Sequence, residues 1–287
     1  MDETWILQGR EISSKDIDCI RGLMVENPAF KRTRLSQEIC QLWNWKNTQG
    51  QIKDMACRTM LLKLEKKGLL VLPPRGSEPG PRKPKAHQPH LKEPIASDFK
   101  SIQPVKIINV KKGGEDQKVF DCLLNEYHYL GYKTSVGENM KYLVFDNSQR
   151  MLACVLFGSA AWKTAPRDIF IGWSDATRQK NVNFITNNTR FLILPWVRVP
   201  HLASHILSLV SKRIVKDWVE KYNHPVVALE TFVDSTRFKG TCYKAANWKY
   251  LGKTKGRTRN DRFNTIQASI KDIYLYPLDP DFRKALA

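Results

Sequence analysis

Apolar residues recur at the spacing of α-helices in three segments of the first 72 residues. These segments are about 17–24, 33–43 and 51–67. In the second segment Leu35, Ile39 and Leu42 are expected to face inward, and in the third Met55 and Leu62 are expected to do so. The pattern predicts three helices that share one small apolar core.

Polar residues on the third predicted helix are candidates for contact with DNA. The apolar run 69–74 predicts a short strand after this helix, so that residues 1–72 form a winged helix-turn-helix unit. Gln51, Asp54 and Arg58 lie at i, i+3 and i+7 and are expected on one face of the helix. That face could enter a major groove, which makes Gln51 and Arg58 candidate DNA-binding residues. The alternative is a solvated helix face.

Proline and glycine become dense after this unit, and the apolar periodicity stops. Residues 73–99 are therefore expected to form an extended basic linker. The remainder, 100–287, is expected to form a second domain.

The second domain alternates between helical and strand patterns. In order, the pattern predicts a helix over 118–132, a hairpin over 141–162 with its turn at 146–148, a buried central strand over 189–199, a helix over 202–222, a strand over 225–234, a short helix over 240–247 and a strand over 248–254. This order indicates an α/β (α+β) class with a mixed sheet and flanking helices.

The charge of the chain points to a polyanionic partner. The 287 residues include 47 Lys and Arg against 28 Asp and Glu, which gives a net charge of +19. Six basic residues face one acidic residue over 249–262, where glycine and threonine separate them. The candidate DNA-binding residues of the second domain are Arg198, Lys249, Lys253, Lys255, Arg257, Arg259 and Arg262.

Cysteine, apolar and tryptophan residues indicate the cellular compartment and possible contacts with bases. Six cysteines lie far apart without a C-x-x-C pair, and no window approaches the roughly 18 apolar residues of a membrane span. We therefore expect reduced thiols in a cytoplasmic protein without membrane contact. Trp162, Trp173 and Trp248 could stack on exposed bases if they lie on the surface, and core packing is the alternative.

Acidic side chains near the end of a predicted strand are candidates for catalysis. Glu230 and Asp234 could hold Mg²⁺ for phosphodiester cleavage, with Asp168 as a further catalytic candidate. The alternative is a buried polar network in which these acids pair with Arg167, Arg190 or Arg237.

The order of elements in the second domain resembles the GNAT acyltransferase fold. In that family the turn after the central strand binds the pyrophosphate of acyl-CoA, and here it reads "RVPHLA", in which Arg198 and Ala203 fit. Pro200 has no N–H to donate and His201 replaces the inner glycine, so acyl-CoA is not expected. Tyr243 falls where the family places the tyrosine that protonates the departing thiolate. The alternative is an aromatic anchor for the last helix.

Four longer stretches resemble the DruA family, which is associated with the Druantia anti-phage system and with transposons. They are "YHYLGY" (127–132), "GSAAWKTAPRDIFIGW" (158–173), "NNTRFLILPWVRVPHLASHILS" (187–208) and "ETFVDSTRFKGTCYKAANWKYLGKTKGR" (230–257). The resemblance implies a DNA-binding component of a defence or mobile-element system, with a large helicase-like subunit or a transposase as partner. The alternative is an enzyme acting on DNA, either a nuclease using Glu230 and Asp234 or a transferase using Tyr243.

Overall fold

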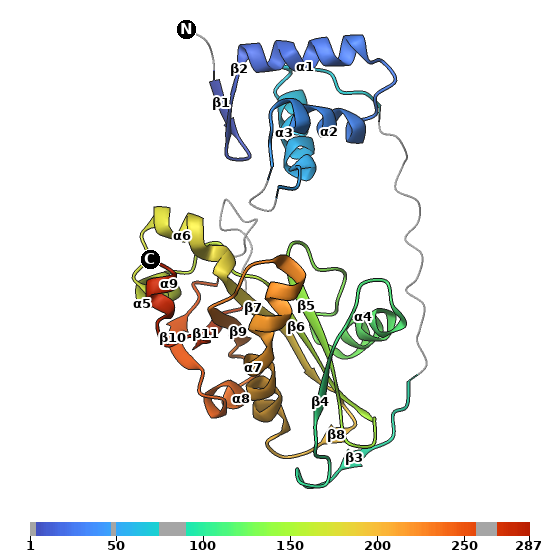
Figure 1. Ribbon diagram of the computed structural model, residues 1–287, viewed down its shortest axis with the longest axis vertical. Coiled ribbons are helices and arrows are strands. Elements are labelled where there is room, and N and C mark those ends of the chain that lie inside the picture. The colour runs from blue at the N-terminus through green and yellow to red at the C-terminus, as the bar shows by residue number, and fades with distance from the viewer. Residues whose placement is uncertain (1–3, 47–49, 75–89, 257–268) are drawn as a thin grey trace. The chain divides into compact units, whose positions relative to one another are not determined.

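The chain divides into two compact units, Met1–Pro84 and Lys85–Ala287. The computed structural model describes residues 4–46, 50–74, 90–256 and 269–287, and Figure 1 shows the elements of each unit. The end of the expected linker 73–99 belongs to the second unit. Ile95 is 4% exposed, and the strand β3 (Ile95–Ala96) pairs in parallel with β8 (Val197–Arg198). Burial of Ile95 therefore ties this part of the chain to the second core.

The described residues of the first unit form a hairpin and three helices. Its elements are β1 (Thr4–Leu7), β2 (Arg10–Ser13), α1 (Ser14–Glu26), α2 (Arg32–Leu42) and α3 (Asp54–Lys66). The Ser13 hydroxyl accepts the Asp16 N–H while the Asp16 carboxylate accepts the Ser13 N–H, a capping box that starts α1 directly after the hairpin. Sequence reasoning missed this hairpin and expected a strand over 69–74, where the structure has none.

The third helix turns a different face to the core from the one expected. Its buried residues are Cys57, Met60, Leu61 and Leu64. Met55 is 64% exposed and Leu62 is 44% exposed. Apolar side chains occur on both faces of α3, so periodicity alone did not identify the buried one. Leu42 of α2 is also exposed, whereas Leu35 and Ile39 are buried as expected.

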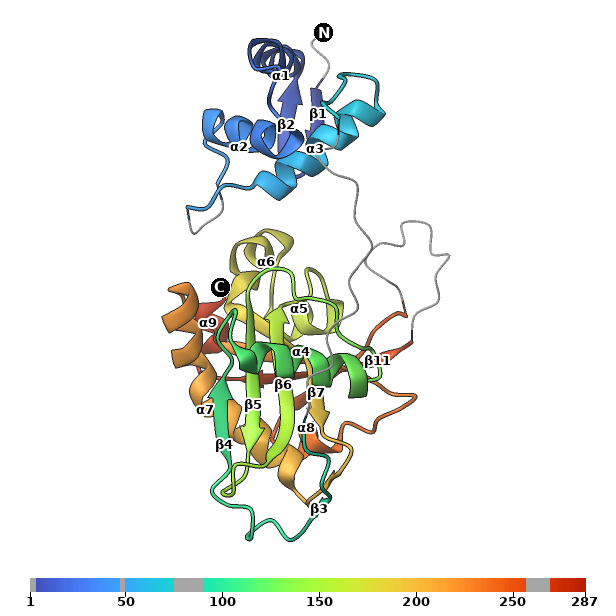
Figure 2. The same ribbon diagram turned by 90° about the vertical axis from the view of Figure 1, so that its right-hand side faces the viewer.

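A seven-stranded sheet in the order β10-β11-β9-β7-β6-β5-β4 forms the centre of the second unit (Figure 2). The strands are β4 (Lys106–Asn109), β5 (Asn139–Phe145), β6 (Met151–Ser159), β7 (Ile185–Ile193), β9 (Ala228–Asp234), β10 (Lys249–Lys253) and β11 (Lys271–Pro277). The β5–β6 hairpin and the central place of β7 confirm two expectations. Only β7 and β9 run parallel among these neighbours, and β11, which was not predicted, lies between β9 and β10.

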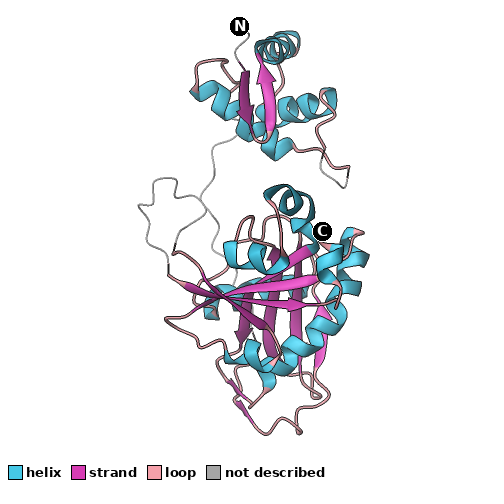
Figure 3. Cartoon of the chain, turned by 90° about the vertical axis from the view of Figure 1, so that its left-hand side faces the viewer, coloured by secondary structure: helices cyan, strands magenta, loops and turns pink. Residues whose placement is uncertain are grey.

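Helices cover both faces of this sheet (Figure 3). They are α4 (Glu115–Tyr127), α5 (Ala165–Ile171), α6 (Asp175–Asn181), α7 (Leu202–Tyr222), α8 (Thr241–Ala245) and α9 (Phe282–Ala285). Successive strand residues point to opposite faces. Lys141 bonds to Asp121 of α4, and the next residue, Tyr142, bonds to Asp217 of α7, so α4 and α7 lie on opposite faces. Among the described residues, no helix combines the length and apolar character that a membrane crossing requires.

Tyr142 joins the sheet to α7 through a buried hydrogen bond, and its removal is a test of this packing. The hydroxyl donates to Asp217 Oδ2 at 2.7 Å, and Arg213 also bonds to that carboxylate. We expect Tyr142→Phe to lower the free energy of unfolding by about 1.5–3 kcal/mol, because a hydrogen bond to a charged group is lost. Chemical denaturation measures the change. Tyr250→Phe, at a half-exposed tyrosine of β10, is the control; equal losses in the two variants would contradict the account.

Candidate functional site

The parallel strands β7 and β9 pair over three residues and then separate. Ile185, Thr186 and Asn187 face Ala228, Leu229 and Glu230, after which β7 continues beside β6 and β9 beside β11. A cleft of about 1460 Å³ opens between the separated segments 188–193 and 231–234. The sheet therefore builds the cleft by its own topology.

Hydrogen bonds between β7, β9 and α8 form one wall of the cleft. The Tyr243 hydroxyl donates to Asn188 Oδ1 at 2.6 Å, and the Thr231 hydroxyl donates to the Asn188 carbonyl at 3.0 Å. Tyr243 is 7% exposed, and burial raises its pKa, so its hydroxyl stays protonated at neutral pH. The Tyr243 ring also packs on the rings of Trp248 and Tyr274. These contacts are those of an aromatic anchor, the alternative named above for Tyr243.

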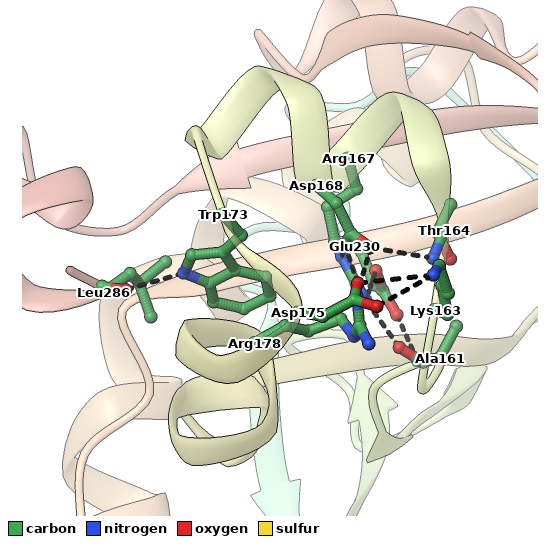
Figure 4. Close-up of polar contacts among 10 residues, drawn as sticks. All are labelled: Ala161, Lys163, Thr164, Arg167, Asp168, Trp173, Asp175, Arg178, Glu230 and Leu286. Atoms are coloured by element: carbon green, nitrogen blue, oxygen red, sulfur yellow. Dashed lines mark hydrogen bonds and ion pairs between the residues drawn. The ribbon is translucent and has the colours of Figure 1, made fainter.

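A buried ion-pair network holds the loop after β6 at the opposite wall (Figure 4). The Arg167 guanidinium is fully buried and donates to Glu230 Oε2 at 2.9 Å, to Asp168 Oδ1 at 2.7 Å and to the Ala161 carbonyl at 2.7 Å. The Ala161 N–H donates to Glu230 Oε1 at 2.6 Å. Both polar groups of the Ala161 backbone are thus bound to the network, and the loop is fixed in place.

This network determines how Glu230 and Asp168 can act. Burial raises the pKa of Glu230, while the Arg167 guanidinium and the Ala161 N–H oppose that rise. Both carboxylate oxygens of Glu230 already accept hydrogen bonds from protein groups, and Asp168 faces Arg167 and Arg178. The arrangement is the buried pairing with Arg167 rather than an open pair of metal ligands.

Asp234 lies four residues beyond Glu230 and belongs to a separate set of contacts. Its carboxylate accepts the hydroxyl of Thr236 at 2.7 Å and the N–H of that residue at 3.1 Å, and the hydroxyl contact lowers the pKa of Asp234. Among the described residues, no group of three or more His, Cys, Asp or Glu side chains is arranged to hold a metal ion. Asp234 thus caps the turn after β9 at the edge of the cleft.

The cleft is basic and rich in aromatic rings. Among the described residues, its six basic lining residues are Lys163, Arg190, Lys239, Lys253, Lys255 and Lys271, against one acidic residue, Asp234. Its aromatic lining residues are Tyr127, Tyr129, Trp162, Phe191, Phe232, Phe238 and Tyr243. Trp162 is 55% exposed and Phe238 is 50% exposed. Exposed rings beside lysines are typical of surfaces that bind unstacked bases and phosphates.

The predicted basic residues of the second domain fall in different places. Lys253 and Lys255 line the cleft. Lys249 lies outside it, with its ammonium group 5.7 Å from the centre of the Phe170 ring, and Arg198 is exposed on β8. Three further candidates, Arg257, Arg259 and Arg262, lie outside the described residues.

The two candidates of the first unit do not share a helix face. Gln51 precedes α3, which begins at Asp54, so Gln51 is not part of the helix. Arg58 pairs with Asp54 at 2.5 Å within the helix. Of the three residues expected on one polar face, only Asp54 and Arg58 lie on the helix, and they bind each other.

Several lining residues were not among the sequence candidates, yet they belong to stretches already singled out. Tyr129, Arg190, Phe238, Lys239 and Lys163 all lie within the four stretches that resemble the DruA family. Apart from Ser269, Lys271 and Ile273, every lining residue does so. Four segments far apart in the sequence thus meet at one cleft, which is the signal that pattern analysis of single elements missed.

The three candidate tryptophans differ in how far their rings are exposed. Trp162 is exposed in the cleft, whereas Trp248 is 4% exposed in the core. The Trp173 indole N–H donates to the Leu286 carbonyl at 2.6 Å beneath α5. Trp162 is therefore the tryptophan whose ring is accessible for stacking.

The turn before α7 differs from a phosphate-binding turn in its backbone. His201 is the N-terminal cap residue of α7 with φ of 62° and without a side-chain capping bond, and Pro200 before it has no N–H. His205 packs edge-on against Phe99, with ring centres 4.6 Å apart. The first turn of α7 is thus shaped by packing contacts.

Comparison with known proteins identifies one family over most of the chain. The family described as Druantia protein DruA matches residues 75–285. A search of curated proteins finds no match. Among solved structures, spermidine N-acetyltransferase of Vibrio cholerae in complex with CoA and spermine is similar at 9% identity, covering 61% of this chain and 95% of that one, with a TM-score of 0.41.

A second solved structure, named as an acetyltransferase of Acinetobacter baylyi, is similar at 11% identity. The match covers 61% of this chain and 92% of that one, with a TM-score of 0.39. Both proteins are named as acetyltransferases, the kind of enzyme whose fold the order of elements in the second domain resembles. The similarity is distant.

Removal of Arg167 tests whether the network is structural. We expect Arg167→Ala to lower the free energy of unfolding by about 3–5 kcal/mol, because it leaves the buried Glu230 carboxylate without its cationic partner. Thermal unfolding measures the loss. Lys284→Ala, which breaks an exposed pair with Asp281, is the control and is expected to have little effect. A loss no larger than that of the control would show that Arg167 is dispensable.

His128 in the cleft wall predicts a pH dependence of stability. Burial and the nearby Arg190 guanidinium lower its pKa from 6.5 to about 4. Between these pH values the unfolded chain binds a proton that the folded chain does not, so stability is present above about pH 6.5 and is lost as the pH falls towards about 4. We expect His128→Asn to flatten this slope in unfolding curves, and His201→Asn, at an exposed histidine, to leave it unchanged. Parallel slopes for all three proteins would contradict the assignment.

Proposed function

Because the chain belongs to the DruA family, we propose that it is the DNA-binding component of an anti-phage defence system and that the cleft between β7 and β9 holds the DNA. The observation that carries the proposal is the lining of this cleft, which in the described part of the chain has six basic residues, one acidic residue and exposed aromatic rings. Family membership supports the role in defence, and the cleft supports the partner.

The electrostatics of the cleft suit a phosphate backbone. Lys239, Lys253 and Lys255 are exposed, and no acidic side chain among the described residues forms an ion pair with them. Lysines that line one cleft without paired acids repel one another, and a polyanion relieves that repulsion. The net charge of +19 adds a long-range attraction for the same ligand.

We also propose that the first unit contacts duplex DNA as a winged-helix module. Its supporting features are three packed helices, a two-stranded hairpin and the exposed Lys63, Lys66 and Lys67 at the end of α3. Lysines at this position could bind phosphates while α3 approaches a groove. A helicase-like subunit or a transposase remains the proposed protein partner of the whole chain.

The contacts of Glu230 and Tyr243 restrict the roles that these residues could have in an enzyme. Glu230 serves the buried network, so a nuclease would depend on other groups. Tyr243 lines the cleft and keeps its proton at neutral pH, so in a transferase it would act as a proton donor and not as a base. DNA binding is the function that accounts for the larger set of lining residues.

The salt dependence of DNA binding tests the proposal. We expect the affinity of the full chain for DNA to fall roughly 10³-fold between 50 and 200 mM salt, because about six phosphates are neutralised. Lys253→Ala should lower the slope of log affinity against log salt by about 1. Fluorescence anisotropy with a labelled oligonucleotide measures both.

The matched control is Lys216→Ala, which removes an exposed lysine of α7 that does not line the cleft. It is expected to keep the slope of the unmodified protein. Binding that ignores salt would refute the proposed function. Equal effects of the Lys216 and Lys253 substitutions would refute the assignment of DNA to the cleft.

A further inference from the structure

Two aromatic platforms face the cleft, and each is followed by a lysine. Trp162 is 55% exposed and precedes Lys163, and Phe238 is 50% exposed and precedes Lys239. All four residues line the same cleft. A flat ring beside a positive charge matches a nucleotide, which presents a flat base beside a phosphate.

The loop that carries Trp162 is rigid although its ring is exposed. On one side of Trp162, the N–H and the carbonyl of Ala161 are bound by Glu230 and Arg167. On the other side, Lys163 pairs with Asp175 at 3.3 Å. The residues on both sides of Trp162 are therefore anchored, and Figure 4 shows the contacts of Ala161 and Lys163. A platform fixed in this way loses little conformational entropy when a ligand stacks on it.

The second platform is a small aromatic group. The ring centres of Phe238 and Tyr129 lie 5.5 Å apart, and the Arg237 guanidinium lies 5.1 Å from the centre of the Tyr129 ring. Phe238 follows β9 and Tyr129 follows α4, whereas Trp162 follows β6, so the two platforms come from separate segments.

Asn187 adds a hydrogen-bonding group deeper in the cleft. It lies at the point where β7 and β9 part, beside Glu230. Its side-chain oxygen is buried and has no hydrogen-bond partner among the described residues. An acceptor in this position could receive an N–H from the edge of a base.

From these features, and resting on the proposed function, we propose that the cleft binds unpaired DNA, with the base of one nucleotide stacked on Trp162. In a duplex the base faces are covered by their neighbours and only edges and phosphates are accessible, so exposed rings gain no stacking there. The volume of about 1460 Å³ exceeds the range of roughly 300–1,000 Å³ typical of small-molecule pockets and suits a segment of a polymer.

The test compares single-stranded and duplex oligonucleotides of the same sequence, about 20 nucleotides long, with the full chain. We expect Trp162→Ala to weaken single-strand binding roughly 5- to 150-fold, the equivalent of one lost stacking contact, and to leave duplex binding almost unchanged. Trp162→Phe should recover part of the loss because it restores a ring. Val136→Ala, which removes an exposed apolar side chain that does not line the cleft, should have little effect.

An oligonucleotide of abasic sites separates bases from phosphates. The unmodified protein should bind it more weakly than the normal strand, whereas the Trp162→Ala variant should bind the two almost equally. Trp162 is exposed, so thermal unfolding should confirm that the variant is folded.

The outcomes distinguish this inference from the function on which it rests. Salt-dependent binding with equal losses for single strand and duplex, or a Trp162→Ala effect no larger than that of Val136→Ala, would overturn the unpaired-strand assignment and leave DNA binding in place. Absence of binding to either form of DNA would overturn both.

Discussion

The structure depends on the point at which β7 and β9 stop pairing. Beyond Asn187 and Glu230 the two parallel strands have different neighbours, and the backbone groups left between them need other partners. On one face the Thr231 hydroxyl reaches across to the Asn188 carbonyl, and Tyr243 fixes the Asn188 side chain. On the other face Glu230 holds the loop after β6. Hydrogen bonds thus join the two strands where they part, and the cleft lies between their separated segments.

The charges around this gap serve two purposes that residue type alone does not separate. Buried charges need partners within the protein, and Arg167 is surrounded by two carboxylates and a carbonyl for that reason. The lysines at the opening lie in water and need no such partners. Arg167 therefore shapes the site, while Lys239, Lys253 and Lys255 are available to a ligand. The same division assigns Glu230 to structure although its position at a strand end suggests chemistry.

Local pattern predicted the elements better than their contacts. The stripe from Leu202 to Trp218 predicted α7 over Leu202–Tyr222, because a long amphipathic helix repeats one signal many times. The turn at 146–148 and the apolar run of β7 were equally clear. The place of β11 between β9 and β10, and the pairing of Arg167 with Glu230, join residues far apart in sequence and leave no local signal. The buried face of α3 was predicted wrongly for a related reason. Met55 is exposed and Met60 is buried, and residue type cannot distinguish two methionines.

The family assignment and the cleft together lead to one claim, that DNA enters the opening between β7 and β9. Photo-crosslinking of the full chain to single-stranded DNA that contains 4-thiothymidine, followed by mass spectrometry of the crosslinked peptides, tests this claim most directly. The account predicts crosslinks in peptides that contain Tyr129, Trp162 or Phe238, the exposed rings of the cleft. Crosslinks confined to residues 4–74, or to the exposed side of α7 around Lys216, would contradict it.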